Sequence, residues 1–234
     1  LAASWHRKPL VYDSHEYFTG VPELQQNHIK RWIWKLLERT IVPRLGFMFT
    51  VNGSIAKLYH DEYGIDVKVI RNLPMQKQAT ATKTKKELAL PEDKSIILLQ
   101  GAGINVDRGA EEAVEAMQFV NNAILLIIGG GDAIENLKAL TQKLHLEEKV
   151  KFLPKQPLEE LMNYTAIADI GLTLDKDTNI NYRYSLPNKL FDYRHAGVPV
   201  LASPMVEVKN IVEQYSVGEC IAAHNPKAIA DKLN

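Results

Sequence analysis

Three stretches of the chain carry side chains that could bind or act on a ligand, and the clearest spans residues 184–192. Its Ser-Leu-Pro-Asn-Lys run leads into a helix predicted over 190–196, which places Ser185, Asn188 and Lys189 around the helix start. A helix N-terminus offers free N–H groups and the positive end of a dipole, and both favour an anion. Lys189 opposes that dipole unless an anion is bound there. Asp192, one turn further on, can accept hydrogen bonds from sugar hydroxyls. The alternative is a solvated helix cap with a surface lysine.

A glycine-bearing loop over residues 101–109 is the second candidate. It lies between a predicted buried strand at 95–100 and a helix predicted over 110–119, an order of elements that cradles phosphate. The loop contains Gly101, Gly103, Arg108 and Gly109. Its spacing fits neither the dinucleotide-binding fingerprint nor the P-loop. Arg108 strengthens the prediction, because a guanidinium pairs with phosphate through two hydrogen bonds.

His15 and Glu16 form the third candidate, just after a strand predicted over residues 9–12. Open α/β sheets place their ligands beyond the C-terminal ends of the strands. An imidazole both donates and accepts hydrogen bonds near neutral pH, so His15 could act on an acceptor hydroxyl or contact a sugar. The alternative is a histidine with a structural role only.

Alternating strands and helices must position these side chains. Strand patterns recur at 47–51, 67–70, 95–100, 123–128, 150–154, 168–174, 198–202 and 218–222, and most of them are separated by helical patterns. This alternation predicts parallel sheets. The fold class is therefore predicted as α/β, with two Rossmann-like domains. The segment 175–184 is predicted to be a long polar loop.

A domain boundary is predicted where the composition changes. Residues 75–87 are polar, rich in lysine and without apolar periodicity, which indicates a linker between domains at 1–74 and 88–234. Residues 1–86 hold 14 Lys and Arg against 7 Asp and Glu, an excess of +7, whereas residues 87–234 hold 14 against 21, or −7. A basic first part suits an anionic surface or a phosphate-bearing acceptor. A charge pattern that serves solubility alone is the alternative.

The segment 29–42 predicts a basic amphipathic helix. Its apolar face consists of Ile29, Trp32, Ile33, Leu36, Leu37 and Ile41, while Lys30, Arg31, Lys35 and Arg39 lie off that face. We favour packing of the apolar face on a sheet, with the basic side in solvent. A basic helix with tryptophans can instead lie on an anionic membrane. Reversible, salt-sensitive contact with such a membrane is therefore the alternative.

Composition limits the class of protein. The 234 residues are 46% hydrophobic and 24% charged, which is ordinary for a globular protein of one or two domains. A single cysteine, Cys220, excludes an intramolecular disulfide and fits a reducing compartment. No signal peptide or membrane-spanning run is visible, so we expect a cytoplasmic protein. Neither a metal-ligand spacing nor the interleaving of basic and aromatic residues typical of nucleic-acid binding occurs.

The stretch 184–203 resembles the donor-sugar motif of GT-B glycosyltransferases, in the group 1 (family 4) branch of retaining enzymes. Members usually carry a Glu, seven further residues and a second Glu, followed by Ala-x-x-x-Gly-x-Pro-Val. Asp192 falls at the second Glu, which in the family binds the donor ribose, and Tyr184 falls at the first. The Ser-Leu-Pro-Asn-Lys run is similar to a variant found in bacterial surface-polysaccharide transferases. The loop 101–109 resembles the family's diphosphate loop, with Ala102 where many members carry an arginine.

The resemblance implies a GT-B enzyme of the hexosyltransferase type. It would move a sugar from a nucleotide-diphosphate donor, most often a UDP- or GDP-sugar, to a polysaccharide or lipid-linked acceptor, with retention and without a metal or cofactor. By the same resemblance, Leu153 and Lys155 would meet the base, and His15 and Glu16 would line the acceptor side. The chain would be a fragment that lacks the start of the N-terminal domain and need not be active alone. A non-catalytic nucleotide-sugar binding module and a nucleotide-sugar 2-epimerase of the same architecture remain as alternatives.

Overall fold

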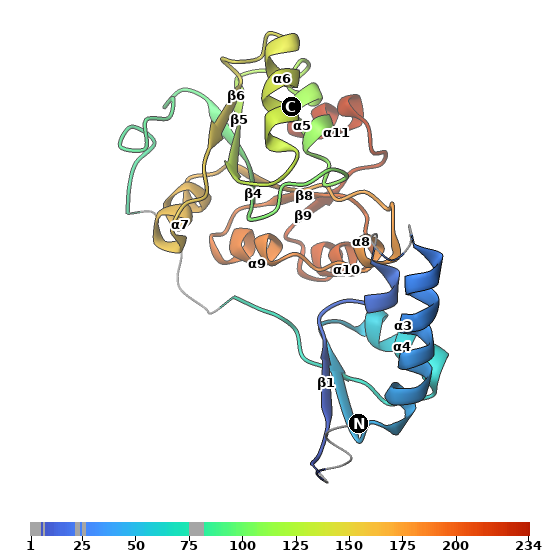
Figure 1. Cartoon of the computed structure of the whole chain (residues 1–234). Helices are drawn as coiled ribbons and strands as arrows, with labels where there is room; N and C mark the ends of the chain where they lie inside the picture. The colour runs from blue at the N-terminus through green and yellow to red at the C-terminus, as the bar shows by residue number, and fades with distance from the viewer. Residues whose placement is uncertain (1–5, 7, 22–23, 25–26, 75–81) are drawn as a thin grey trace. The chain divides into compact units, whose positions relative to one another are not determined.

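A computed structural model of the chain describes residues 6, 8–21, 24, 27–74 and 82–234 (Figure 1). The chain divides into two compact units. Unit 1 comprises residues 1–72 and 177–186, and unit 2 comprises residues 73–176 and 187–234. Each unit is built on its own parallel sheet, and each is considered by itself below.

Unit 1 is a three-stranded parallel sheet with the order β1-β2-β3. Its elements are β1 (Val11–Ser14), η1 (Phe18–Gly20), α3 (His28–Ile41), η2 (Val42–Arg44), β2 (Phe47–Thr50), α4 (Gly53–Tyr63), β3 (Lys68–Val69) and, from the later segment, α8 (Ile180–Arg183). Asn52 begins α4 by accepting a hydrogen bond from the Ile55 amide, and Gly64 ends it in a left-handed conformation. These are the residue types that helix starts and ends require.

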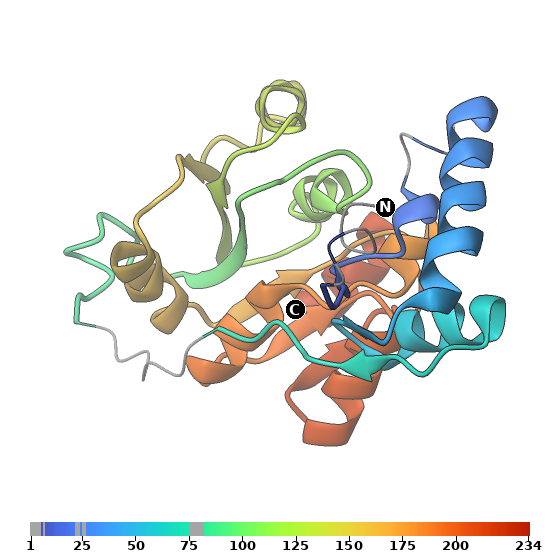
Figure 2. The same ribbon diagram turned by 60° about the horizontal axis from the view of Figure 1, so that its bottom comes forward.

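A polar network joins α3 to α4, which lie side by side (Figures 1 and 2). The Lys35 ammonium donates to the Glu62 carboxylate at 2.6 Å and to the Tyr17 hydroxyl at 2.7 Å. The Tyr63 hydroxyl donates to Glu38 at 2.7 Å, and Glu38 is only 7% exposed. Burial opposes the ionisation of Glu62, but the hydrogen bonds from Lys35 and Tyr17 outweigh it and lower the pKa of Glu62. The side chain of Lys35 therefore belongs to the interior of unit 1 and not to its basic outer side.

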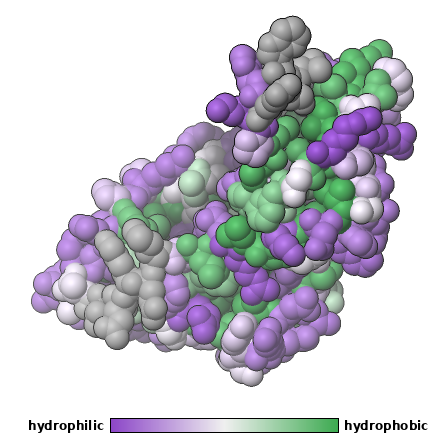
Figure 3. Space-filling model, turned by 90° about the horizontal axis from the view of Figure 1, so that it is seen from below, coloured by the Kyte–Doolittle hydropathy of each residue, from purple (hydrophilic) through white to green (hydrophobic). Residues whose placement is uncertain are grey.

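The apolar face of α3 is exposed, which corrects the favoured prediction that it packs on a sheet. All six of its residues are between 41% and 74% exposed, with Ile29 at 74% and Trp32 at 65%. Glu38 is the buried residue of the helix. Several apolar residues of the unit 1 strands and their flanks, including Leu10, Val11 and Phe47, are exposed as well. Hydrophobic surface is visible from below the molecule in Figure 3.

Unit 2 is a six-stranded parallel sheet with the order β6-β5-β4-β7-β8-β9. Its strands are β4 (Ser95–Gly101), β5 (Ala123–Gly129), β6 (Val150–Leu153), β7 (Ile170–Thr173), β8 (Val200–Ala202) and β9 (Gly218–Cys220). Its helices are α5 (Ala110–Ala116), α6 (Ile134–Lys143), α7 (Leu158–Ala166), α9 (Asn188–His195), α10 (Val206–Tyr215) and α11 (Pro226–Leu233). Figure 1 shows α5, α6 and α11 on one face of the sheet and α7, α9 and α10 on the other. This is the doubly wound order in which the third strand lies at one edge and the first and fourth are neighbours.

The core of unit 2 lies around its two central strands. Residues 96–99 of β4 and 124–128 of β5 are each at most 2% exposed, because helices cover both faces of the sheet. Continuous apolar runs of this kind are what buried parallel strands require. The prediction of an α/β fold with parallel sheets in two Rossmann-like units is confirmed.

The structure differs from the sequence-based predictions in one loop and one helix, and it describes only part of the predicted linker. The predicted loop 175–184 contains the short helix α8, which Asn179 begins by accepting from the Tyr182 amide. Helix α5 ends at Ala116, three residues before its predicted end at 119. Of the predicted linker, residues 75–81 lie outside the described residues, whereas Lys83 pairs with Glu160 of α7 at 2.7 Å. The predicted domain boundaries stay a prediction.

Candidate functional site

A pocket of about 460 Å³ opens in unit 2 at the carboxyl end of β4. This is where the strand order reverses between β4 and β7, the place at which doubly wound sheets bind their ligands. Three segments supply most of its lining, namely residues 100–108, residues 155–156 and the start of α9. The lining residues are Gln100, Gly101, Ala102, Gly103, Asn105, Arg108, Ile128, Gly129, Lys155, Gln156, Leu161, Pro187, Asn188, Lys189 and Asp192.

Backbone hydrogen bonds fasten the glycine loop after β4 to the loop after β5. The Ile104 amide donates to the Gly130 carbonyl at 2.7 Å, and the Ala133 amide donates to the Ile104 carbonyl at 3.2 Å. Gly129 has a φ of +148°, and a Cβ there would lie 1.8 Å from the Gly101 oxygen. Only glycine lets the two loops approach so closely. The pocket wall is therefore held by backbone contacts that need no ligand.

Helix α9 presents Asn188, Lys189 and Asp192 to the pocket from its first two turns. It begins just after Pro187, and its first turn carries no acidic side chain. The buried Tyr193 anchors the helix by donating from its hydroxyl to the Leu98 carbonyl of β4 at 3.1 Å. The N-terminus of α9 is thus oriented toward the pocket with its dipole uncompensated by its own residues.

Helix α5 differs, because its first turn contains Glu111 and Glu112. Glu112 pairs with Lys176 at 2.7 Å. These two carboxylates already compensate the positive end of the α5 dipole. The pocket therefore depends on Arg108 more than on the α5 dipole for positive charge.

Two of the lining cations, Arg108 and Lys189, interact with a buried carboxylate beside the pocket, that of Asp175. Arg108 Nη1 lies 3.3 Å from Asp175 Oδ1, and Asp175 is only 2% exposed. Burial lowers the pKa of Lys189 and Arg108 adds to that effect, while the charge of Asp175 opposes it. Neither Asp175 oxygen accepts a hydrogen bond within the part of the chain that the structure describes.

Asp192 is connected to the strand β4 through Gln100. The Gln100 Nε2 amide donates to Asp192 Oδ2 at 3.2 Å. Burial raises the pKa of Asp192, while the hydrogen bond from Gln100 and the nearby His195 lower it in part. Asp192 is half-buried and lines the pocket, so its carboxylate can accept from a hydroxyl of a ligand.

The structure brings together seven of the ten predicted donor-site residues around this pocket. These are Gly101, Gly103, Arg108, Lys155, Asn188, Lys189 and Asp192. Gly109 lies behind the wall, where its φ of +73° and its packing on the Leu174 backbone shape the loop. Leu153 ends β6 without lining the pocket, and Ser185 belongs to unit 1. Sequence reasoning missed Gln100, Asn105 and Asp175, whose local patterns carry no signal beyond a strand end and a polar loop.

The remaining predicted residues lie in unit 1, just past β1. His15 is exposed, and its Nε2 atom lies 3.0 Å from Asp13 Oδ2. Glu16 is also exposed, and its carbonyl accepts from the Ser14 hydroxyl at 2.6 Å. Ser185, in the later segment of unit 1, is half-buried, and its hydroxyl oxygen is fully buried. Their predicted roles toward an acceptor or donor stay predictions.

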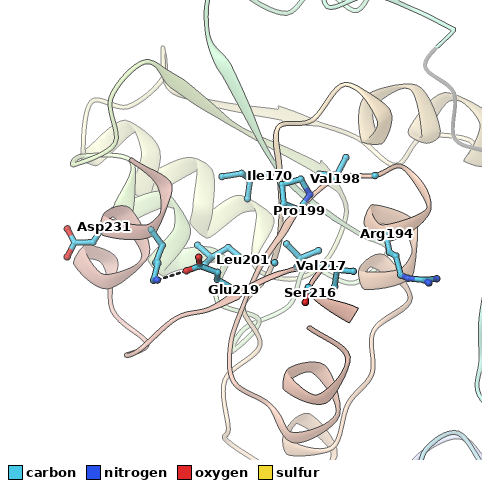
Figure 4. Close-up of a pocket in the computed structure, with 13 residues that line it drawn as sticks. Ile170, Arg194, Val198, Pro199, Leu201, Ser216, Val217, Glu219 and Asp231 are labelled. Carbon is cyan, nitrogen blue, oxygen red and sulfur yellow. Dashed lines mark hydrogen bonds and ion pairs between the residues drawn. The ribbon is translucent and has the colours of Figure 1, made fainter. Parts of the chain in front are cut away.

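A second pocket, of about 730 Å³, lies at the opposite edge of the unit 2 sheet (Figure 4). Ile170, Val200 and Gly218, at the amino ends of β7, β8 and β9, contribute to it. Its lining cation Lys232 pairs with Glu219, and the guanidinium of Arg194 lies 5.2 Å from the centroid of the Tyr215 ring. Although this pocket is larger, it lies at the end of the sheet where doubly wound folds do not bind their ligands.

No group of three or more His, Cys, Asp and Glu side chains within the described residues is arranged to hold a metal ion. None of the described helices is both long and apolar enough to cross a membrane.

Parallel sheets in two units, with a pocket lined by Arg108 and Lys189 at the switch point of the second, define a nucleotide-binding α/β protein of the GT-B type. The family model "Glycosyl transferases group 1" matches residues 80–234, so the chain belongs to this glycosyltransferase family. No match was found among curated proteins.

Solved glycosyltransferase structures share the fold. One from Rickettsia africae ESF-5 aligns with a TM-score of 0.77 at 16% identity, over 99% of this chain and 61% of its own. WaaG, described as involved in lipopolysaccharide biosynthesis, aligns with a TM-score of 0.71 at 14% identity, over 99% of this chain and 70% of its own. Anabaena Alr3699/HepE, solved with UDP and glucose, aligns with a TM-score of 0.74 at 17% identity, over 100% of this chain and 63% of its own. At these identities the likeness establishes the fold, and the chain spans about three fifths of the first of these proteins.

Proposed function

We propose that unit 2 binds the nucleotide-diphosphate sugar from which a group 1 glycosyltransferase takes its sugar. The observation that carries the proposal is one pocket lined by Arg108, Lys189 and Asp192. The two cations and the start of α9 would stabilise the diphosphate, both in the donor and as it leaves. Asp192 would accept from the ribose, and Lys155 would lie toward the base.

We propose further that the whole protein transfers a hexosyl group to a polysaccharide or lipid-linked acceptor, with retention and without a metal. His15 and Glu16 would contact the acceptor, because they follow a strand of unit 1 at its carboxyl end. The Leu153 backbone would add a contact to the base. The UDP-bound Anabaena relative supports a uridine nucleotide as the first donor to test, with guanosine second.

Calorimetric titration of the chain with UDP-, GDP- and ADP-sugars tests donor binding. We expect one of these nucleotides to bind at a single site, with affinity that falls as salt increases, because the diphosphate contacts are ionic. Absence of binding to all three would contradict the proposal. The acceptor role of His15 requires the whole protein, in which His15→Ala should reduce transfer but leave donor affinity unchanged.

A non-catalytic nucleotide-sugar binding module is the second candidate. Ala102 and Tyr184 stand where the family usually has a phosphate-binding Arg and a Glu, and this favours it. Incubation of the whole protein with donor and acceptor separates the two. A glycosylated product supports the transferase, epimerised donor supports the 2-epimerase, and unchanged donor despite binding supports the module.

We propose that the protein is cytoplasmic and that α3 makes peripheral contact with an anionic membrane. Its exposed apolar face includes Trp32, and Lys30 and Arg31 on the same helix are exposed as well. Each cation near an anionic surface contributes about 1 kcal/mol, which salt weakens. Lys35 is not expected to contact the membrane, because its ammonium forms an ion pair with Glu62.

Sedimentation with lipid vesicles tests the membrane contact. We expect binding to vesicles that contain phosphatidylserine, no binding to phosphatidylcholine alone, and release by salt. Joint substitution Lys30→Gln and Arg31→Gln should weaken it, whereas Lys138→Gln with Lys151→Gln in unit 2 is the matched control. Protein that stays in the supernatant with anionic vesicles at low salt would rule the contact out.

A further inference from the structure

A buried amide at the end of β4 connects the pocket carboxylate to helix α7. Gln100 is 2% exposed, and its Nε2 atom donates to Asp192 Oδ2 at 3.2 Å. Its Oε1 atom lies 2.7 Å from the Thr165 hydroxyl, which is a donor to it. Thr165 is fully buried. The direction in which the amide faces therefore depends on the Asp192 carboxylate on one side and the Thr165 hydroxyl on the other.

The direction of the amide matters for the charge that Asp192 carries. With its oxygen toward the Thr165 hydroxyl, Gln100 turns its NH₂ group toward Asp192, and an ionised carboxylate can only accept. The Oδ1 atom of Asp192 makes no hydrogen bond with the residues that the structure describes, so it is available to a ligand in the pocket. A hydrogen bond to a fully buried partner also fixes the carboxylate in one rotamer.

We propose that Gln100 and Thr165 are positioning residues that hold the Asp192 carboxylate in place to accept from the ribose hydroxyls of the nucleotide. The inference rests on the proposed donor site. It explains how that site would select nucleotides with a ribose over those with a deoxyribose. A site built to accept from a hydroxyl discriminates against the analogue that lacks it. The sequence pattern does not indicate this role for Gln100, because the residue stands there as the last residue of a buried strand.

The same three residues can satisfy a second hydrogen-bond arrangement. If Asp192 is protonated, it donates to the Gln100 oxygen once the amide has turned over, and the Gln100 NH₂ group then donates to Thr165. The Thr165 hydroxyl is free to donate to the Leu161 carbonyl, which lies at 2.9 Å. The proton on Asp192 and the orientation of Gln100 are therefore linked.

The pH dependence of this arrangement follows from the groups around Asp192. Burial raises its pKa, and Gln100 and His195 lower it. The other titratable groups on α9 or on the pocket wall are Tyr193, Arg194, Lys189, Arg108 and Lys155. Ribose binding needs the ionised carboxylate, so affinity should be lost as pH falls through the pKa of Asp192. Removal of the Gln100 donor raises that pKa, and the loss should then occur at a higher pH.

Titration with UDP and GDP and with their 2′- and 3′-deoxy counterparts tests the inference. The wild-type chain should prefer a ribonucleotide over one of its deoxy forms. Gln100→Met, which conserves volume, removes the hydrogen bond to Asp192, and Thr165→Val removes the hydrogen bond that orients Gln100. Each should reduce that preference by roughly 3–10-fold, the equivalent of one ordinary hydrogen bond. In both variants, the loss of ribonucleotide affinity at low pH should also begin at a higher pH than in the wild type. The affinity for the deoxy form should change little.

Thr141→Val is the matched control. Thr141 is 3% exposed, and its hydroxyl donates to the Leu137 carbonyl one turn earlier in α6, as Thr165 can in α7. The ribose preference of this variant should equal that of the wild type. If Gln100→Met fails to fold, Thr165→Val alone carries the test. An unchanged ribose preference in a folded Thr165→Val chain would overturn the inference while the donor site stands. If the wild-type chain binds none of these nucleotides, it is the proposed donor site that fails.

Discussion

Arg108 and Asp175 form an ion pair beside the pocket, with Nη1 and Oδ1 3.3 Å apart. The carboxylate is buried, whereas 31% of the arginine side chain is exposed. Asp175 also stabilises the charge of Lys189. A diphosphate that enters the pocket would therefore meet two cations that already share an anion, and its affinity depends on how the three charges balance.

We expect Arg108→Ala to weaken nucleotide-sugar binding by roughly 1.5–3 kcal/mol, the range for hydrogen bonds to charged groups. The reason is that the guanidinium lines the pocket at the end of the glycine loop. Calorimetric titration measures the change. Arg194→Ala is the control, because Arg194 lies in the pocket at the opposite edge of the same sheet. Equal effects of the two substitutions would remove Arg108 from the site.

Asp175→Asn should strengthen the binding of a nucleotide diphosphate by about 1 kcal/mol, since it removes a negative charge near the phosphates. The gain should be greater for the free nucleotide diphosphate than for the nucleotide sugar, because the former carries more negative charge. The same titration compares the two ligands. Weaker binding in the variant would mean instead that Asp175 acts chiefly by orienting Arg108.

Gly109→Ala should destabilise unit 2 by about 1–2 kcal/mol for the left-handed conformation alone, and further through a clash. A Cβ at Gly109 would lie 2.1 Å from the Leu174 oxygen. Gly197 has nearly the same φ, +72°, but a Cβ there meets nothing within 4 Å among the described residues. Gly197→Ala therefore measures the conformational cost alone. Urea unfolding followed by far-ultraviolet circular dichroism should show the larger loss for Gly109→Ala.

Lys35→Met should destabilise unit 1 by about 1–3 kcal/mol, because Glu38 and Glu62 lose their shared cation. All three tryptophans lie within residues 1–72, so tryptophan fluorescence during urea unfolding reports on this unit. Lys57→Met, which breaks an exposed pair with Asp61, should cost at most about 1 kcal/mol.

The pH dependence of unit 1 gives an independent test of the same network. The pKa of Glu62 is lowered in the folded state, so its contribution is present above its ordinary pKa and is lost as pH falls through the lowered value. This part of the acid destabilisation should be smaller in Lys35→Met than in the wild type. An identical acid dependence in both proteins would show that Lys35 and Glu62 are not coupled.

The sequence predicts the elements of unit 2 well because their patterns are local. Residues 96–99 and 124–128 are unbroken apolar runs, and glycine-bearing loops follow both. The joint position of Arg108, Lys189 and Asp192 was also predictable, because parallel strands bring their carboxyl ends to one edge.

Other features depend on contacts that the sequence does not display. Asp175 belongs to a polar stretch, and nothing in its neighbours indicates that its carboxylate is 2% exposed. Gln100 reads as a strand end, and its partner Asp192 lies 92 residues away. The amphipathic pattern of α3 predicted its apolar face correctly, but periodicity does not state whether a partner covers that face.

The sheet order of unit 2 also has a consequence for the order of folding events. Strand β4 pairs with β5 and also with β7, and β7 is separated from it by two complete strand–helix units. Such long-range pairing closes a large loop and is slow. In the folded unit, residues 100–108 follow β4 and residues 187–192 follow β7, so the pairing of β4 with β7 brings these two parts of the pocket together. Recovery of nucleotide binding during refolding should therefore lag behind the recovery of helical circular dichroism, and it would serve as a probe for the last stage of assembly.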